Sequence, residues 1–317
     1  MTKSYRSLAD VEHAPEGRAV AVGMFDGVHI GHRALLKRLA EIAQAEGSRS
    51  CVLTFANHPL YVLRPEECPP LITAWWRKLE ILTGLGIDDV VLIEFTRECA
   101  SLTAEVFVTE VLGSRLDART VVGGPNFRFG QGAAGTPQTI EALGGPLGIR
   151  TRVVEIVRNG KEIASSTALR SLLAEGDVQS AGRMLGEPFV LSGIVEPGAR
   201  RGAELGFATA NMRVPRGLVV PGDGVYACEA ECRGERRRAA VSIGSRPTFG
   251  GGETVIETHI MDYLEQDLYG EELTLRFVTR LRGQRRYDHV EDLVRQMRED
   301  GEAARRALGE PRVGPAG

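Results

Sequence analysis

The sequence predicts an α/β domain with a parallel sheet, followed by an all-β domain that a final helix closes. In the first part of the chain, short apolar strands alternate with segments whose apolar residues recur at helical spacing, which is typical of βαβ crossovers. Near residues 186–188 the helices give way to short strands separated by Gly/Pro turns, which indicates a barrel or a sandwich. The length of 317 residues also favours about two domains. We place the first domain at 1–185 and the second at 186–303.

The elements of the first domain follow from their apolar patterns. A strand at 18–22 stops at Gly23, and a helix at 33–43 ends at Gly47, because glycine after the last periodic residue favours a helix end. Further strands are expected at 50–55, 89–95, 119–122 and 152–157. Further helices are expected at 76–85, 104–112 and 164–185.

The second domain is expected to consist of short strands and one helix. The strands are expected at 190–195, 225–230, 238–243, 255–260 and 273–278. A helix at 290–300 closes the domain. The stretch 301–317 is rich in Ala, Arg, Gly and Pro and is expected to fray, with 304–317 assigned as a disordered tail.

Composition narrows the classes of function. The formal net charge of -3 argues against a protein that coats nucleic acid, because such a protein needs a basic excess. Residues 1–11 lack the apolar core of a signal peptide, and no apolar run approaches the ~20 residues that cross a bilayer. The five cysteines fit neither a zinc site nor a disulfide framework. We expect a cytoplasmic protein with reduced thiols, no nucleic-acid partner and no membrane contact.

A glycine-rich turn with two histidines directly follows the first of these strands. It reads Gly-Met-Phe-Asp-Gly-Val-His-Ile-Gly-His over residues 23–32. Its glycines let the backbone approach a phosphate closely, and the helix that starts near Gly31 points free amides at an anion. His29 and His32 can both donate to one phosphate, and Asp26 is expected to orient the turn. The alternative is a structural turn with exposed histidines, but the strand–turn–helix context favours a phosphate site.

A second segment, Ala-Ser-Ser-Thr-Ala-Leu-Arg at 164–170, supports this interpretation. It places hydroxyl groups at a helix start and Arg170 one turn later. Hydroxyls and amides can hold a pyrophosphate, and an arginine can bind it with two hydrogen bonds. Taken alone, the segment is better explained as an ordinary Ser/Thr helix cap.

The second domain contains a further candidate site. A polar stretch, Leu-Gly-Phe-Ala-Thr-Ala-Asn, occupies 205–211, and Glu257 lies in an expected strand with Ile256 and Thr258 on the opposite face. A carboxylate that shares a face with a nucleotide-holding Thr/Asn pair could accept a proton from an alcohol. From the pattern alone, a solvated strand glutamate is the better explanation.

These residues carry a resemblance to a known family. The turn at 23–32 with Ser-Ser-Thr-x-x-Arg at 165–170 resembles the nucleotidyltransferase superfamily, and more closely the amino-terminal module of bacterial bifunctional riboflavin kinase/FAD synthetase. Further matches in that module lie at 54–55, 58–59, 126–130 and 135. The second domain is similar to the riboflavin kinase module, with matches at 206–211, 223–226, 242–244, 246–249, 257–259 and 267–270.

The resemblance implies a Rossmann-like nucleotidyltransferase domain, then a six-stranded β-barrel riboflavin kinase domain with a C-terminal helix. It implies that three residues are catalytic: His29 and His32 on ATP phosphates, and Glu257 as the general base on the ribityl 5′-hydroxyl. Ser166, Thr167 and Arg170 would bind the leaving pyrophosphate. Magnesium would be held near Thr209, Asn211 and Asn126. The residues expected to bind nucleotide are Gly23, Phe25, Asp26, Gly31, Asn126, Arg128, Ser166, Thr167, Arg170, Gly206, Thr209 and Asn211.

The implied activity has two steps. ATP phosphorylates riboflavin to FMN, and a second ATP then adenylylates FMN to FAD with release of pyrophosphate; both steps need Mg²⁺. Riboflavin, FMN and ATP are therefore the expected partners, with FMN and FAD as intermediate and product. A weak homo-oligomer is also among the expectations.

Four departures from the family pattern keep alternatives open. Pro125 stands where an acidic residue is common, Ala203 replaces an arginine, Ala208 replaces a proline, and Gln284 replaces a glutamate. They leave open an adenylyltransferase alone, or a paralogue for a flavin analogue with an impaired kinase domain. A non-enzymatic flavin- or RNA-binding regulator is disfavoured, because both histidines, Asn211 and Glu257 are present.

Overall fold

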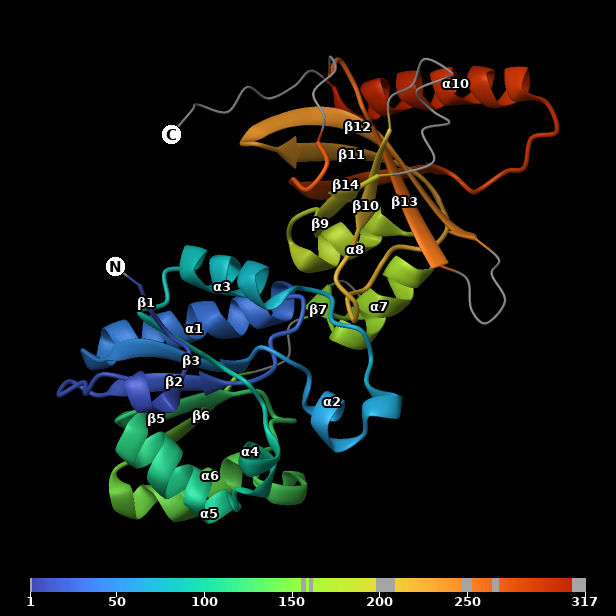
Figure 1. Cartoon of the computed structure of the whole chain (residues 1–317). Helices are drawn as coiled ribbons and strands as arrows, with labels where there is room; N and C mark the ends of the chain where they lie inside the picture. Colours follow the sequence, from blue (N-terminus) through green and yellow to red (C-terminus); the bar gives the residue numbers. More distant parts are fainter. Residues whose placement is uncertain are drawn as a thin grey trace. The chain divides into compact units, whose positions relative to one another are not determined.

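The chain folds into two compact units, Met1–Ser166 and Thr167–Gly317 (Figure 1). The computed structural model describes residues 2–154, 158–159, 162–197, 209–246, 253–263 and 268–309. Within these residues, no helix combines the length and apolar character needed to cross a membrane. The division between the compact units precedes residue 186, where the sequence pattern changes and where we expect the second functional domain to begin.

The first unit is built on a six-stranded sheet in which every neighbouring pair is parallel. Its strands are β1 (Lys3–Tyr5), β2 (Arg18–Val22), β3 (Arg49–Phe55), β4 (Asp89–Ile93), β5 (Ala118–Gly123) and β6 (Arg150–Val153). The order is β1-β4-β3-β2-β5-β6. The chain therefore proceeds to one side of β2 and then returns to add β5 on its other side. The carboxyl ends of the strands at such a switch point are where open α/β sheets bind ligands.

Helices cover both faces of this sheet (Figure 1). The α-helices of this unit are α1 (Ile30–Glu46), α2 (Pro59–Leu63), α3 (Trp75–Gly84), α4 (Arg97–Ser101), α5 (Ala104–Val106), which continues as a π-helix (Phe107–Arg115), and α6 (Pro137–Gly144); of these, α2 lies to the side of the sheet. Alternate residues of β2 point to opposite sides: Ala19 packs in the cluster that includes α1 and α3, and Val20 in the cluster that includes the π-helix and α6. Burial on both faces explains the continuous apolar strands, and the expected α/β domain is confirmed.

The second unit is a closed six-stranded barrel of order β10-β13-β12-β11-β14-β9, in which all pairs are antiparallel. Its strands are β9 (Phe189–Glu196), β10 (Ala210–Arg213), β11 (Gly224–Cys232), β12 (Glu235–Arg246), β13 (Glu253–Ile260) and β14 (Glu272–Arg282). The expected six-stranded barrel is thus confirmed, and the sandwich alternative is excluded. A two-stranded ribbon of β7 (Arg158–Asn159) and β8 (Glu162–Ile163) lies between the two large sheets in sequence.

The helices of the second unit differ from the sequence expectation. The single helix expected at 164–185 is two helices, α7 (Ser166–Ala174) and α8 (Val178–Leu185). They separate at Gly176, whose φ of 78° favours glycine, and Asp177 caps α8 by accepting a hydrogen bond from the amide of Ser180. Strand β10 was not expected, because four residues are too few to show an alternating pattern.

The expected end of the last helix is also wrong. Helix α10 runs from Val290 to Leu308 rather than ending at residue 300, so residues 304–308 belong to no disordered tail. Ala304 has no exposed surface and packs in a cluster with Ala227 and Met261, and Leu308 lies against the same cluster. Asp300 also accepts two hydrogen bonds from Arg282 of β14, at 2.8 and 2.6 Å. Packing on the barrel therefore extends the helix beyond the point that composition suggests. Residues 310–317 lie outside the described part of the chain.

A buried ion pair lies at the amino ends of the parallel strands. Arg18 and Asp89 are 1% and 0% exposed, and the Arg18 Nε donates to the Asp89 carboxylate at 2.8 Å. Arg49 donates to the same carboxylate at 2.8 and 2.7 Å. Burial raises the pKa of Asp89, but the hydrogen bonds from Arg49 and Arg18 outweigh burial, so the pKa lies below its ordinary value of 3.8.

We predict that Asp89→Asn lowers the unfolding free energy of the first unit by about 3–5 kcal/mol, because it removes the buried charge that Arg18 contacts at 2.8 Å and leaves Arg18 only the longer contact with Asp117 at 3.3 Å. Both tryptophans, Trp75 and Trp76, lie in α3, so tryptophan fluorescence in a urea titration reports unfolding of this unit.

The lowered pKa of Asp89 stabilises the fold above pH 3.8, and this contribution disappears as the pH falls through the lower, folded-state pKa. Glu41→Gln is the control, since its pair with Arg38 is exposed. Equal effects of both substitutions would contradict the prediction.

Candidate active sites

The glycine turn between β2 and α1 has an unusual backbone. Phe25, Gly27 and Val28 have φ values of 47°, 82° and 37°. Such values suit Gly27, but they strain Phe25 and Val28, which are 4% and 0% exposed. Strained residues persist where the surroundings hold them, and they concentrate at functional sites. The turn lies at the carboxyl end of β2, at the switch point of the sheet.

His29 and His32 lie together at the start of α1. Their rings are stacked, with centroids 3.7 Å apart and 15° between the ring planes. His29 Nδ1 accepts a hydrogen bond from the backbone N–H of His32 at 3.3 Å and so caps the helix. When neutral, His29 then carries its proton on Nε2, which leaves an N–H available as a donor. The expected pairing of the two histidines at a helix amino end is present in the structure.

Both histidines are held neutral. Burial lowers the pKa of His29 to about 4. Burial lowers the pKa of His32 well below its ordinary value, and electrostatic interactions with His29 and Lys78 lower it further. The Nδ1 atom of His32 is buried without a hydrogen-bond partner among the described residues. Such a buried polar atom beside a helix amino end is the feature expected of a site completed by a ligand.

Asp26 and Gly31 connect this turn to neighbouring segments. The Asp26 carboxylate is buried and accepts hydrogen bonds from the backbone N–H groups of Ile72 and Thr73, at 3.0 and 3.2 Å. The hydroxyl of Ser166 donates to the backbone carbonyl of Asp26 at 2.9 Å. A Cβ on Gly31 would lie 3.1 Å from the His29 ring, so glycine leaves room for that ring. Asp26 therefore orients the turn, and direct contact of Asp26, Gly31 or Phe25 with a nucleotide stays a prediction.

A large apolar cavity adjoins the turn. It has a volume of about 740 Å³ and is lined by residues at the carboxyl ends of β2, β3 and β4 and by residues of the segment that follows β5. Gly23 and Met24 form part of its wall, so the cavity and the histidine turn share a boundary. The exposed residues Asn126 and Arg128 also line it, as does the stacked ring pair Phe127–Phe129. Asn126 and Arg128 thus lie at this cavity, and their contact with a nucleotide stays a prediction.

Thr167 and Arg170 lie on α7, after the hydroxyl of Ser166. From Thr167 onward the helix belongs to the second compact unit. The role of Thr167 and Arg170 at a pyrophosphate therefore stays a prediction.

In the barrel, the structure brings the residues of the second candidate site together. Glu257 on β13 pairs in register with Asn211 on β10 and with Ser242 on β12. A small internal pocket of about 140 Å³ is lined by Glu257, Thr209 and His259, among others. Thr209, Asn211 and Glu257, which the sequence analysis named from two distant segments, therefore lie close together in the barrel wall.

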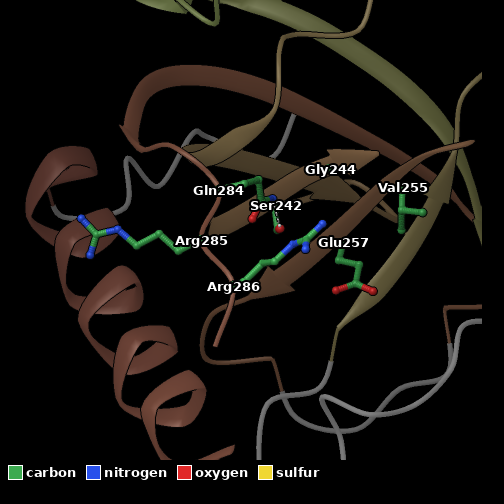
Figure 2. A pocket seen from close by; sticks show the side chains of 7 residues that line it. All are labelled: Ser242, Gly244, Val255, Glu257, Gln284, Arg285 and Arg286. Atoms are coloured by element: carbon green, nitrogen blue, oxygen red, sulfur yellow. Dashed lines mark hydrogen bonds between the residues drawn. The ribbon is translucent and has the colours of Figure 1, made fainter. Parts of the chain in front are cut away.

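A wider pocket of about 400 Å³ opens beside Glu257 (Figure 2). Glu257, Gln284 and Arg286 are among its lining residues. Figure 2 shows that Arg286 extends toward the middle of the pocket, whereas Arg285 extends toward α10. The side-chain amide of Gln284 donates to the Ser242 hydroxyl at 2.9 Å and to the Ile243 carbonyl at 2.8 Å. The pocket thus has a carboxylate on one wall and a guanidinium group opposite.

Sequence reasoning did not identify Lys78, Arg286 or Tyr287 as part of either site. Tyr287 lines the small pocket, and its hydroxyl is buried without a partner among the described residues. These residues carry no motif, so only their position in the fold reveals them. Gly206, Ala203 and Ala208 were named from the sequence and lie outside the described residues.

The two units together define a chain with a nucleotidyltransferase-type α/β site and a barrel of the flavokinase type. Two family models match it in succession: FAD synthetase over residues 11–168 and riboflavin kinase over residues 185–308. The second match ends where α10 ends.

Relatives of known name match almost the whole chain. "Bifunctional riboflavin kinase/FMN adenylyltransferase" of Escherichia coli (strain K12) is 34% identical and covers 97% of this chain and 98% of the relative. The protein of the same name from Bacillus subtilis (strain 168) is 34% identical and covers 90% of each chain. A crystal structure titled "Macrolide-efflux Protein", from Streptococcus pneumoniae, has a TM-score of 0.85 at 30% identity, over 96% of this chain and 98% of that one. The chain belongs to the bifunctional riboflavin kinase/FMN adenylyltransferase family.

We predict that His29 makes the first unit sensitive to mild acid. Because its folded-state pKa is about 4 and its ordinary value is 6.5, the unfolded chain takes up the proton first as the pH falls below 6.5. Between pH 8 and pH 5 this costs about 2 kcal/mol of unfolding free energy. His29→Asn, which keeps a helix-capping oxygen, is expected to make the acid-dependent loss smaller by about this amount in urea titrations followed by tryptophan fluorescence, while the contribution of buried His32 remains in both proteins. The same pH dependence in both proteins would show that His29 is not held neutral.

Proposed function

We propose that this chain converts riboflavin to FAD in two transfers. ATP phosphorylates riboflavin at the barrel, and the resulting FMN is adenylylated by a second ATP at the α/β unit. The observation that supports this proposal most directly is that two separate groups of candidate catalytic residues lie in the two matched regions of the chain. The histidine turn lies in residues 11–168, and the Asn211–Glu257 pair lies in residues 185–308.

In the first transfer, Glu257 acts as the general base. Its carboxylate takes the proton of the ribityl 5′-hydroxyl as that oxygen bonds to the γ-phosphorus, and the bond from this phosphorus to the β–γ bridging oxygen breaks, releasing ADP. Thr209 and Asn211 hold the ATP phosphates beside Glu257, which the cross-strand pairing of Asn211 with Glu257 supports. Arg286 across the pocket favours binding of an anionic group there.

Mg²⁺ fits this first site as a partner of ATP. Thr209 and Asn211 offer neutral oxygens, which suit a hard cation that keeps several waters and phosphate oxygens. Within the described residues there is no group of three or more His, Cys, Asp or Glu side chains that could hold a metal ion. Residues of this chain would therefore hold the ion jointly with the nucleotide, and Mg²⁺ would neutralise phosphate charge when bound.

In the second transfer, the histidine turn serves the triphosphate of ATP. A phosphate oxygen of FMN bonds to the α-phosphorus, and the bond to pyrophosphate breaks. His29, with its proton on Nε2, and His32 donate to the phosphates, and the amino end of α1 adds backbone N–H groups. Ser166, Thr167 and Arg170 bind the leaving pyrophosphate, and Asn126 lies beside the nucleotide and its Mg²⁺.

The cavity beside the turn suits the flavin of FMN. Its volume of about 740 Å³ falls within the range of small-molecule sites, and its wall is largely apolar and aromatic. Phe127 and Phe129 offer aromatic faces for a planar ring system. The shared wall at Gly23 and Met24 would place the FMN phosphate next to the histidine turn.

We predict that Glu257→Gln lowers the conversion of riboflavin to FMN by about 100-fold or more and leaves the conversion of FMN to FAD unchanged, because only the first step needs this base. His29→Ala with His32→Ala is expected to do the reverse. Each protein is incubated with Mg-ATP and either riboflavin or FMN, and the flavins are separated by chromatography. Glu272→Gln, exposed on β14, is the control.

Damage to both steps by either variant, in a folded protein, would refute the assignment of separate sites. Conversion of FMN alone by the unsubstituted protein would support the narrower adenylyltransferase.

We predict that removing divalent metal with EDTA stops both conversions, and that Mg²⁺ added in excess restores both. The physical reason is that each transfer develops charge on phosphate oxygens, which the ion neutralises. Full activity of either step in EDTA would contradict the magnesium requirement for that step.

A further inference from the structure

Lys78 is a lysine in an unexpected place. It lies on α3 and has no exposed surface, although lysine is among the residues most rarely buried. Its ammonium group donates to the backbone carbonyl of Met24 at 2.9 Å and to that of Phe55 at 2.7 Å. Met24 belongs to the glycine turn, and Phe55 is the last residue of β3. One side chain therefore joins the turn to the neighbouring strand.

The segment just before this helix holds the turn at a second point. Ile72 and Thr73 donate their backbone N–H groups to the Asp26 carboxylate, a few residues before Lys78. The strained residue Phe25 lies between the two points of attachment, Met24 and Asp26. The Thr54 hydroxyl adds a hydrogen bond to the Met24 carbonyl at 3.1 Å. These contacts supply the surroundings that a strained backbone requires.

We propose that Lys78 is a positioning residue for adenylyl transfer: it fixes the Met24 carbonyl so that the turn presents His29 and His32 to the nucleotide phosphates. This inference rests on the proposed adenylyltransferase function of the first unit. Lys78 touches neither substrate nor reacting atoms in this account and acts through the backbone of the turn.

The charge of Lys78 distinguishes this role from packing alone. The Lys78 ammonium interacts electrostatically with two titratable groups. Asp26 in the turn favours the charged form of the ammonium, and the ammonium lowers the pKa of His32 on α1. Burial lowers the pKa of Lys78 to about 8, against the opposing effect of Asp26. The ammonium is therefore charged near neutral pH and loses its proton as the pH rises through 8. Deprotonation leaves fewer donors for the two carbonyls and removes the positive charge beside His32.

The test compares Lys78→Met, Lys78→Arg and the exposed control Lys37→Met in the full chain. For Lys78→Met we expect kcat for FMN adenylylation to fall about 100-fold, with a smaller change in KM for ATP, because the turn is misplaced in the transition state. Riboflavin phosphorylation, measured as FMN plus FAD, stays unchanged because it takes place in the barrel. Tryptophan fluorescence in a urea titration reports whether the first unit, which contains Lys78, is folded. Lys78→Arg keeps a charge and donors and is expected to recover part of the rate. Unchanged adenylylation in Lys78→Met would overturn the proposal.

The pH dependence of adenylylation distinguishes this role from a merely structural one. In the unsubstituted protein, kcat/KM for ATP in adenylylation is expected to fall as the pH rises through about 8, and Lys78→Met is expected to lack this alkaline decline. If Lys78→Met does not fold, the pH profile of the unsubstituted protein is compared with that of Lys78→Arg. The alkaline decline is expected to be absent from Lys78→Arg, since arginine keeps its charge in that pH range. The absence of a decline in the unsubstituted protein, or its persistence in either variant, would overturn the proposal. If the unsubstituted protein makes no FAD from FMN at any pH, the proposed function itself fails.

Discussion

The conformation of the turn between β2 and α1 is the constraint on which the first site depends. Two buried residues that are not glycine, Phe25 and Val28, have positive φ values there. Such residues cost on the order of 1–3 kcal/mol each. The structure offsets this cost with the Asp26 carboxylate, the Lys78 ammonium and the Ser166 hydroxyl, all bonded to backbone groups. The result is a helix amino end on which two neutral histidines are held in a stack.

The sequence predicts the parts of this arrangement that a local pattern encodes. The strand, the glycines and the histidines are contiguous, so periodicity and spacing suffice to place them at a helix start. The buried lysine is different, because Lys78 lies in an ordinary amphipathic helix, where a lysine is expected to face solvent. Only the tertiary packing of α3 against the turn shows that it is buried. Arg18 is a similar case, since a charged first residue of a strand gives no sign of full burial.

In the barrel, the site could be predicted only with the help of family resemblance. Glu257 has the pattern of a solvated strand residue, and β10 is too short to be recognised by alternation. The meeting of Asn211 with Glu257 depends on the register between strands that lie far apart in sequence. The end of α10 illustrates the same limit: Gly301 suggests a stop, whereas Ala304 and Leu308 pack on the barrel and extend the helix.

The most direct test of the account is a time course with the purified chain, riboflavin and excess Mg-ATP, with the flavins resolved by chromatography. The account predicts that FMN appears first and that FAD follows, with one pyrophosphate released for each FAD formed. Failure to form FMN from riboflavin would contradict the role of the barrel. Accumulation of FMN without FAD, or FAD without matching pyrophosphate, would contradict the role of the histidine turn.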